Sequence, residues 1–112
     1  MTFANLRRLS LALAIAATTF VQLAGTPARA AQEIQVSIHN FTFTPPELKV
    51  KVGDTVTWTN QDDTPHTVVS AGKFKSKTMD SDDKFSFTFT SAGDYKYACS
   101  LHPHMTAMIK VE

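Results

Sequence analysis

The chain has only one cysteine among its 112 residues and no arginine after Arg29. A single thiol excludes an intramolecular disulfide, and in an oxidising compartment a free thiol is prone to oxidation unless a ligand occupies it. Beyond residue 30 the chain carries eight lysines against ten acidic residues, a formal charge of −2. That balance excludes the clustered basic surface that nucleic-acid binding requires. Cys99 is therefore the residue that most needs an explanation.

An apolar run long enough to cross a bilayer is also missing. The apolar stretch that follows Arg7 and Arg8 is interrupted by threonine and is shorter than the roughly 20 residues of a membrane helix. It ends at Ala28-Arg29-Ala30, and this order of segments is typical of an export signal with a small-residue cleavage site. We predict a signal peptide over residues 1–30, cut after about Ala30, and one domain over residues 31–112 without stable membrane contact.

No segment of this domain shows the period of an amphipathic helix. Apolar and polar residues alternate instead, which is the pattern of half-buried strands. The alternating sets are Ile34, Val36 and Ile38; Leu48, Val50 and Val52; Val56 and Trp58; Phe85, Phe87 and Phe89; Tyr95, Tyr97 and Cys99; and Ile109 and Val111. Turn-forming residues, among them two adjacent prolines and two Gly-Asp pairs, separate them. Short strands joined by turns predict an antiparallel β-sandwich or barrel, with Trp58 and the phenylalanines in its core.

Three residue types that bind soft metals recur at intervals of three residues, as Cys99, His102 and Met105. This spacing lets one tight loop between two strands turn three side chains towards one point. A thiolate with two imidazoles and a weak axial methionine is the ligand set of blue-copper electron-transfer sites. One more histidine is needed, and His66, which follows a proline in the loop after the Trp58 strand, is the candidate. We predict that His66, Cys99, His102 and Met105 bind one copper ion.

The remaining histidines and methionines lack this spacing. We expect His39 to be structural and His104 to lie exposed near the site without binding the ion. Met79 and Met108 are expected to pack in the interior, where the flexible thioether fills gaps.

These segments resemble the cupredoxins, and among them the amicyanin group. The matching residues are Pro46-Glu47-Leu48, the run from Val50 to Trp58, Pro65-His66, Thr88-Phe89-Thr90 with Ala92-Gly93, and the loop from Cys99 to Met105. The short ligand loop is specific, because plastocyanins place more residues between the second histidine and the methionine. The resemblance implies an all-β Greek-key sandwich of about seven to eight short strands and one type 1 copper. Two positions depart from the amicyanin pattern: Thr67 stands where asparagine is common, and His104 replaces an aromatic residue.

We therefore predict a small periplasmic electron carrier, not an enzyme, that cycles copper between Cu(I) and Cu(II). We expect a monomer that docks briefly near His102 with a redox donor and acceptor, such as a dehydrogenase or a cytochrome. The alternative is a module that stores or delivers copper, because the same ligands suit that role. An enzyme is a further rival, but Met105 would fill the coordination position that a catalytic metal keeps open.

Overall fold

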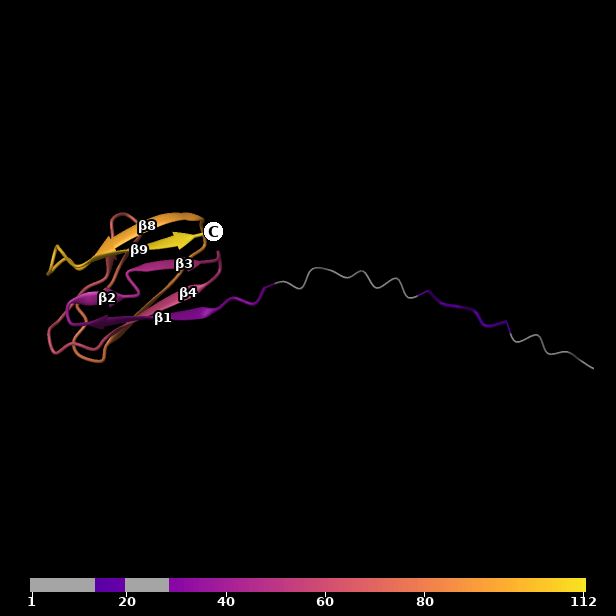
Figure 1. The fold of residues 1–112 in the computed structure, drawn as a ribbon, viewed down its shortest axis with the longest axis horizontal. Coiled ribbons are helices and arrows are strands. Elements are labelled where there is room, and N and C mark those ends of the chain that lie inside the picture. Colours follow the sequence, from indigo (N-terminus) through magenta and orange to yellow (C-terminus); the bar gives the residue numbers. More distant parts are fainter. Residues whose placement is uncertain (1–13, 20–28) are drawn as a thin grey trace, which may run out of the picture.

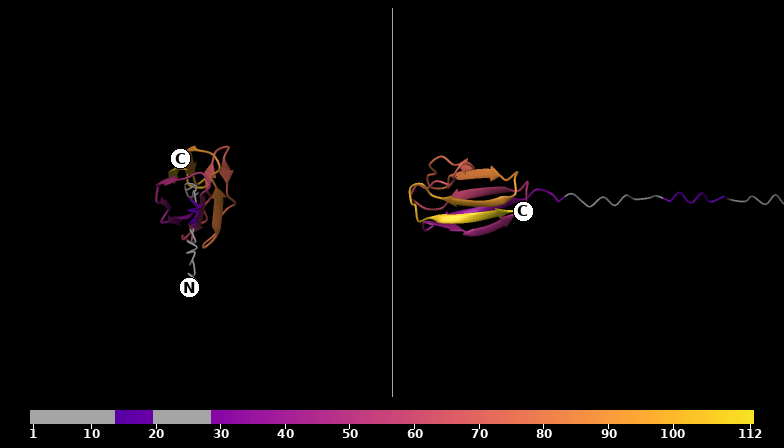
Figure 2. Two further views of the ribbon diagram at one scale, coloured as in Figure 1. Left: turned by 90° about the vertical axis from the view of Figure 1, so that its right-hand side faces the viewer. Right: turned by 90° about the horizontal axis from the view of Figure 1, so that it is seen from above.

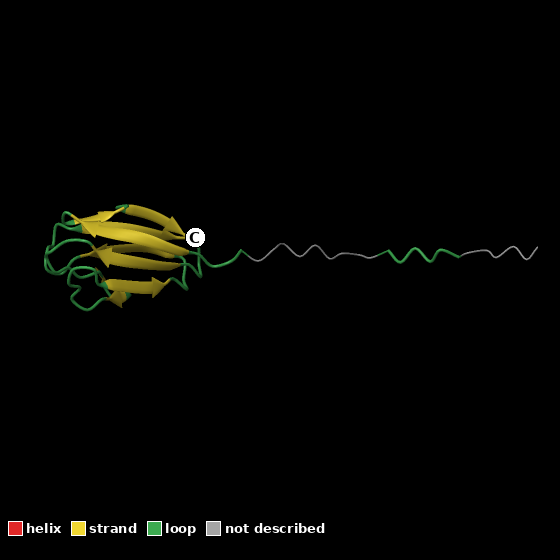
Figure 3. Ribbon diagram, turned by 90° about the horizontal axis from the view of Figure 1, so that it is seen from below, coloured by secondary structure: helices red, strands yellow, loops and turns green. Residues whose placement is uncertain are grey.

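The computed structural model describes residues 14–19 and 29–112. Most of the predicted export signal lies outside the described residues, and residues 14–19 have no regular secondary structure. The described residues form strands and loops, as Figure 3 shows. None of them belongs to a helix able to cross a membrane.

The described chain folds into two sheets that pack face to face (Figures 1 and 2). The strands are β1 (Glu33–His39), β2 (Thr42–Thr44), β3 (Glu47–Val50), β4 (Thr55–Asn60), β5 (Val69–Ser70), β6 (Phe74–Lys75), β7 (Lys84–Thr88), β8 (Gly93–Ala98) and β9 (Thr106–Val111). One sheet has the order β2-β1-β4-β7 and the other β3-β9-β8-β5-β6. The chain passes repeatedly from one sheet to the other, as in a Greek key. The predicted all-β sandwich is confirmed.

The strand pairing differs in detail from the expectation. Three strands that the alternation does not reveal, β2, β5 and β6, have only three, two and two residues. Two pairs are parallel, β1 with β4 and β3 with β9, within an otherwise antiparallel arrangement. The second predicted strand also stops early: β3 ends at Val50, and Val52 is 48% exposed. Val52 lies outside the core because the chain turns at Gly53, whose φ of +96° favours glycine.

The core lies between the sheets and is rich in aromatic rings. Trp58 and Phe89 are fully buried, and the Trp58 ring packs 5.5 Å from that of Tyr97 and 5.6 Å from that of Phe74. Phe85 is only partly buried but packs on the same cluster. Large rings let a domain of this size fill its interior with few residues.

A buried carboxylate ties the chain together where β4 begins. Asp54 accepts hydrogen bonds from the backbone N–H groups of Gln32 (3.0 Å) and Lys51 (2.9 Å) and from the guanidinium of Arg29 (2.9 and 3.1 Å). The Arg29 guanidinium, followed by the two amides, holds the pKa of Asp54 well below its usual range. Only the Arg29 contact would be lost on cleavage after Ala30.

The loop between β8 and β9 lies at the end of the sandwich opposite the C-terminus (Figure 1). The turn between β1 and β2 lies at this same end. The predicted ligands thus lie in the β4–β5 and β8–β9 loops, while the strands beneath these loops are paired and packed.

The first prediction concerns the aromatic core between the two sheets. Replacing Phe89 by alanine is expected to lower the free energy of unfolding by about 3–5 kcal/mol, because the change leaves a cavity among packed rings. Urea unfolding of the metal-free protein measures the loss. Val52→Ala, at an exposed apolar position, is the control and should change stability by about 0.5 kcal/mol or less. Equal effects of the two substitutions would contradict the packing described.

Candidate metal centre

Cys99 reaches the interior because it continues the alternation of β8. Tyr95 and Tyr97 point into the sandwich, and Cys99, two residues further on, is 1% exposed. The loop after Cys99 is closed by backbone hydrogen bonds from Cys99 N–H to the Met105 carbonyl (3.0 Å) and from Met105 N–H to the His102 carbonyl (2.9 Å). Both bonds hold the segment that carries three of the predicted ligands in one compact turn.

His66 is fixed from the other side of the site by a backbone bridge. It exchanges two hydrogen bonds with Met79, His66 N–H to Met79 carbonyl at 3.1 Å and Met79 N–H to His66 carbonyl at 2.8 Å. The buried amide of Asn60 supports this bridge by donating to the carbonyls of Thr64 (3.0 Å) and Met79 (2.9 Å). The His66 side chain is fully buried as a result.

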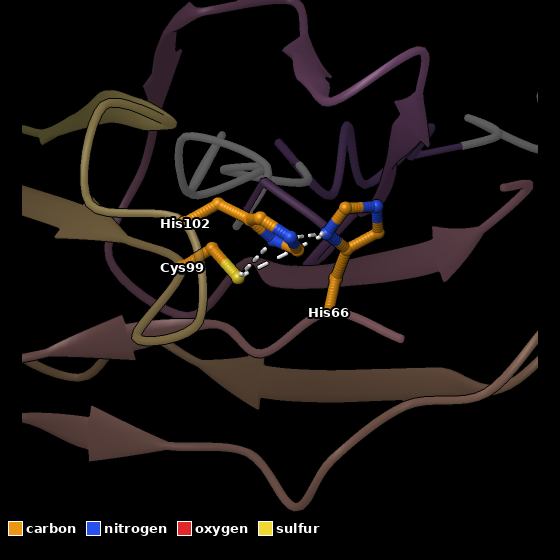
Figure 4. A group of neighbouring side chains, drawn as sticks. All are labelled: His66, Cys99 and His102. Atoms are coloured by element: carbon orange, nitrogen blue, oxygen red, sulfur yellow. Dashed lines mark hydrogen bonds between the residues drawn. The ribbon is translucent and has the colours of Figure 1, made fainter. Parts of the chain in front are cut away.

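The structure brings the donor atoms of His66, Cys99 and His102 together (Figure 4). The Sγ atom of Cys99 lies 3.9 Å from Nδ1 of His66 and 3.5 Å from Nδ1 of His102, and the two nitrogens are 3.2 Å apart. A point equidistant from these three atoms would lie about 2.1 Å from each, which matches metal–nitrogen and metal–sulfur bonds of about 2.0–2.3 Å. The three donors therefore fit one transition-metal ion.

Met105 and His104 take different places around this cluster. Met105, the predicted axial ligand, is 5% exposed and belongs to the core. His104 is exposed, as predicted. His39 is exposed at the end of β1, whereas Met79 is buried and Met108 half-buried.

The hydrogen bonds around His66 select the nitrogen that faces the cluster. Its Nε2 lies 2.8 Å from Oδ2 of Asp62, and a carboxylate there accepts a hydrogen bond from the Nε2–H group. Nδ1 is then the ring nitrogen that faces Cys99 and His102. A carboxylate behind a histidine is a common support for a metal ligand.

Thr67 ties the two ligand loops to each other. Its N–H donates to Sγ of Cys99 at 3.3 Å, and its hydroxyl accepts from the N–H of Ser100 at 2.8 Å and lies 2.7 Å from the Ser100 hydroxyl. The residue after the first histidine thus braces the site through a hydroxyl, where the amicyanin pattern has the amide of asparagine.

The surroundings favour the thiolate form of Cys99. Burial alone would raise the pKa of its thiol. The Thr67 N–H, the two imidazoles and the Leu101 N–H outweigh burial and lower that pKa to about 6. A buried thiolate beside two imidazole nitrogens is a donor set that binds copper in preference to magnesium or calcium.

Sequence reasoning missed the residues that hold these ligands in place. Asp62, Asn60 and Met79 support His66, and the Phe41 ring packs edge-on against His66 (5.2 Å) and His102 (5.0 Å). Asp62 stands four residues before His66 in a polar loop, and this short separation was the one feature of the sequence that could have indicated their contact. Phe41 lies far away in the sequence, and no such feature indicated its contacts.

Comparison with known proteins agrees with this fold and donor set. A family model described as a cupredoxin-like domain matches residues 10–111. The chain belongs to the cupredoxin-like family. This cupredoxin is 41% identical to the amicyanin of Paracoccus denitrificans over 70% of the chain and 65% of that protein. It is 34% identical to amicyanin-alpha of Methylorubrum extorquens over 96% of the chain and the whole of that protein.

Solved structures give the same result. An oxidised amicyanin variant superposes with a TM-score of 0.69 at 43% identity, covering 71% of this chain and 82% of the variant. A reduced variant gives 0.69 at 41% identity, over 76% and 87% of the two chains. The cupredoxin is thus similar to amicyanins in both sequence and fold, although it spans about two thirds of the length of the Paracoccus denitrificans protein.

The thiolate chemistry of Cys99 generates a prediction for the metal-free cupredoxin. Ultraviolet thiolate absorbance should titrate with a midpoint near pH 6, well below the ordinary thiol value of 9.0. Because the unfolded chain holds a proton that the folded chain has released, stability should rise between about pH 6 and pH 9 and be lost as the pH falls through 6. Cys99→Ser should show neither effect. A midpoint at the ordinary thiol value would contradict the favoured thiolate.

Proposed function

We propose that this cupredoxin is a one-electron carrier that binds a single type 1 copper ion through His66, Cys99, His102 and Met105. The observation that carries the proposal is the convergence of Sγ of Cys99 and the two Nδ1 atoms within 3.9 Å of one another, in a buried site. Bound copper would supply a one-electron couple, Cu(I)/Cu(II). The similarity of the chain to amicyanins in sequence and in fold supports the same function.

The four side chains have different tasks in this proposal. Cys99 supplies the short metal–sulfur bond, and the buried His66 supplies one nitrogen. Met105, which is buried in the core, would be the weak fourth ligand that tunes the potential. His102 is the one predicted ligand that is partly exposed, so it is the proposed point of entry and exit for electrons.

The surface around His102 suits brief contact with redox partners. Leu101 is 50% exposed and Phe41 48% exposed, while Pro103 and His104 beside them are also exposed. Small, mostly apolar contacts release quickly, as a carrier requires. We propose a monomer that meets a redox donor and acceptor here, a dehydrogenase or a cytochrome.

An enzyme or a copper-delivery module fits the structure less well. A groove of about 820 Å³ runs across the outer face of the β3–β9–β8–β5 sheet, but none of the four proposed ligands lines it. This groove therefore does not open on the proposed copper site. Handing copper to an acceptor exchanges ligands, and the burial of His66, Cys99 and Met105 hinders that exchange.

The location follows from the sequence before residue 31. We propose export to the periplasm with cleavage after about Ala30, because the paired arginines, the apolar stretch and the small residues have the order of an export signal. The remaining domain would carry the formal charge of −2.

Copper loading tests the proposed function directly. The protein given cupric salt should become intensely blue, with the absorption and electron paramagnetic resonance spectrum of a type 1 site, because a thiolate bonds covalently to Cu(II). Cys99→Ser should remove the blue band, since a hydroxyl cannot replace the thiolate. A colourless wild-type protein would refute the proposed function, and a blue Cys99→Ser protein would refute the assignment of Cys99.

The axial assignment has its own test. Met105→Ala should retain the blue colour but raise or lower the reduction potential, because the axial ligand tunes the copper without forming its strongest bond. Protein-film voltammetry measures the shift. Met108→Ala, which alters a half-buried methionine of β9, is the matched control and should leave the potential unchanged. An unchanged potential in Met105→Ala would remove Met105 from the ligand set.

A further inference from the structure

The turn between β1 and β2 holds an aromatic residue in an unfavourable backbone conformation. His39 pairs with Thr42, so Asn40 and Phe41 alone form the connection, and their φ angles are +52° and +57°. Two-residue hairpin turns of this kind favour Asn-Gly, because both central residues need positive φ. Asn40 suits its position. Phe41 occupies the place where glycine would be free of strain, and strain of this sort is kept where surrounding contacts impose it.

The carboxylate of Asp62 holds the Asn40–Phe41 turn in this strained conformation. Oδ1 of Asp62 accepts from the Asn40 N–H at 2.6 Å, and Oδ2 accepts from the Phe41 N–H at 2.9 Å. The same Oδ2 lies 2.8 Å from Nε2 of His66. The Asp62 side chain is only 11% exposed, and its backbone N–H donates to the buried Asn60. The strained turn and the metal-ligand histidine are therefore fastened to one side chain.

Fixing the turn also fixes the Phe41 ring over the donor set. The ring meets the His66 imidazole at an interplanar angle of 89° and the His102 imidazole at 88°, edge-on in both cases. Its outer side remains half exposed. Phe41 is thus the apolar cover over both imidazoles at this end of the sandwich.

We propose that Asp62 is a positioning residue of the copper site, acting through His66 Nε2 and through the Asn40–Phe41 turn. The proposal rests on the proposed function, because it assigns Asp62 a role in the site that binds copper. Through the first contact, Asp62 holds the ring proton on Nε2 and leaves Nδ1 for the metal. Through the second, it keeps the Phe41 ring over the two imidazoles and limits the access of water and competing ligands.

The first contact predicts a preference between the two oxidation states. A carboxylate behind a ligand histidine makes the imidazole a better donor, and the negative charge favours the more positive ion. Removing that charge should weaken Cu(II) binding more than Cu(I) binding. The reduction potential should then rise, which a role confined to folding would not cause.

The test compares two neighbouring aspartates in the full-length protein. Asp62→Asn should lower Cu(II) affinity about 10–100-fold and raise the reduction potential. Asp63→Asn removes the same charge from the exposed adjacent residue and should leave both quantities unchanged. If the two variants behave alike, Asp62 has no positioning role. A wild-type protein that binds copper and turns blue keeps that result distinct from a failure of the proposed function.

A second variant tests the turn even where Asp62→Asn folds poorly. Phe41→Gly relieves the positive-φ strain, so the metal-free protein should unfold at the same or a higher urea concentration. The copper-loaded variant should nevertheless lose its metal faster to an added chelator such as EDTA, because the cover is gone. Val52→Ala, at an equally exposed apolar position, is the control and should release copper at the wild-type rate. Wild-type release from Phe41→Gly would overturn the role of the turn.

Discussion

The rest of the structure depends on three donor atoms that are held close together in one site at the end of the sandwich. Sγ of Cys99 and the two Nδ1 atoms lie 3.2–3.9 Å apart in a site from which water is largely excluded. Such an arrangement is unfavourable for unpaired polar groups unless each is hydrogen-bonded or binds a metal. The Thr67 N–H on the sulfur and the Asp62 carboxylate on the far nitrogen of His66 satisfy the remaining bonding capacity of these groups.

The bracing reaches the site from two loops that are fastened independently and then to each other. The His66 loop is held by its backbone bridge to Met79, and the Cys99 loop is closed on Met105. Thr67 and Ser100 join the two loops through their hydroxyls. In the proposed function, such contacts would hold the ligands in place when the charge of a bound ion changes, because a preorganised site limits the rearrangement that accompanies each electron transfer.

The sequence was sufficient for the parts of the fold that repeat and for the ligands that share a loop. Period-two alternation identifies β1, β3, β4, β7, β8 and β9, but β5 and β6 have too few residues to show a period. Alternation also does not encode a partner, so the parallel pairing of β1 with β4 could not be foreseen. Cys99 and His102 were found because metal-binding residue types three residues apart in one loop can reach a single ion. Met79 was not, because it supports His66 through backbone atoms that every residue type possesses.

His66 and His102 are held differently. In the proposed function, His66 would therefore affect the properties of the copper ion, and His102 the contact with redox partners. His66 is fully buried and bonded to a carboxylate, so substitutions around it act on the ion through the protein interior. His102 is partly exposed next to Leu101, and Leu101 and Phe41 are exposed apolar side chains near it. Apolar contact acts only at short range, whereas charge steers partners from a distance and weakens with salt. In the proposed function, contact at the His102 end would therefore depend on the fit between surfaces, whereas the contacts of His66 with the protein interior would influence the strength of copper binding.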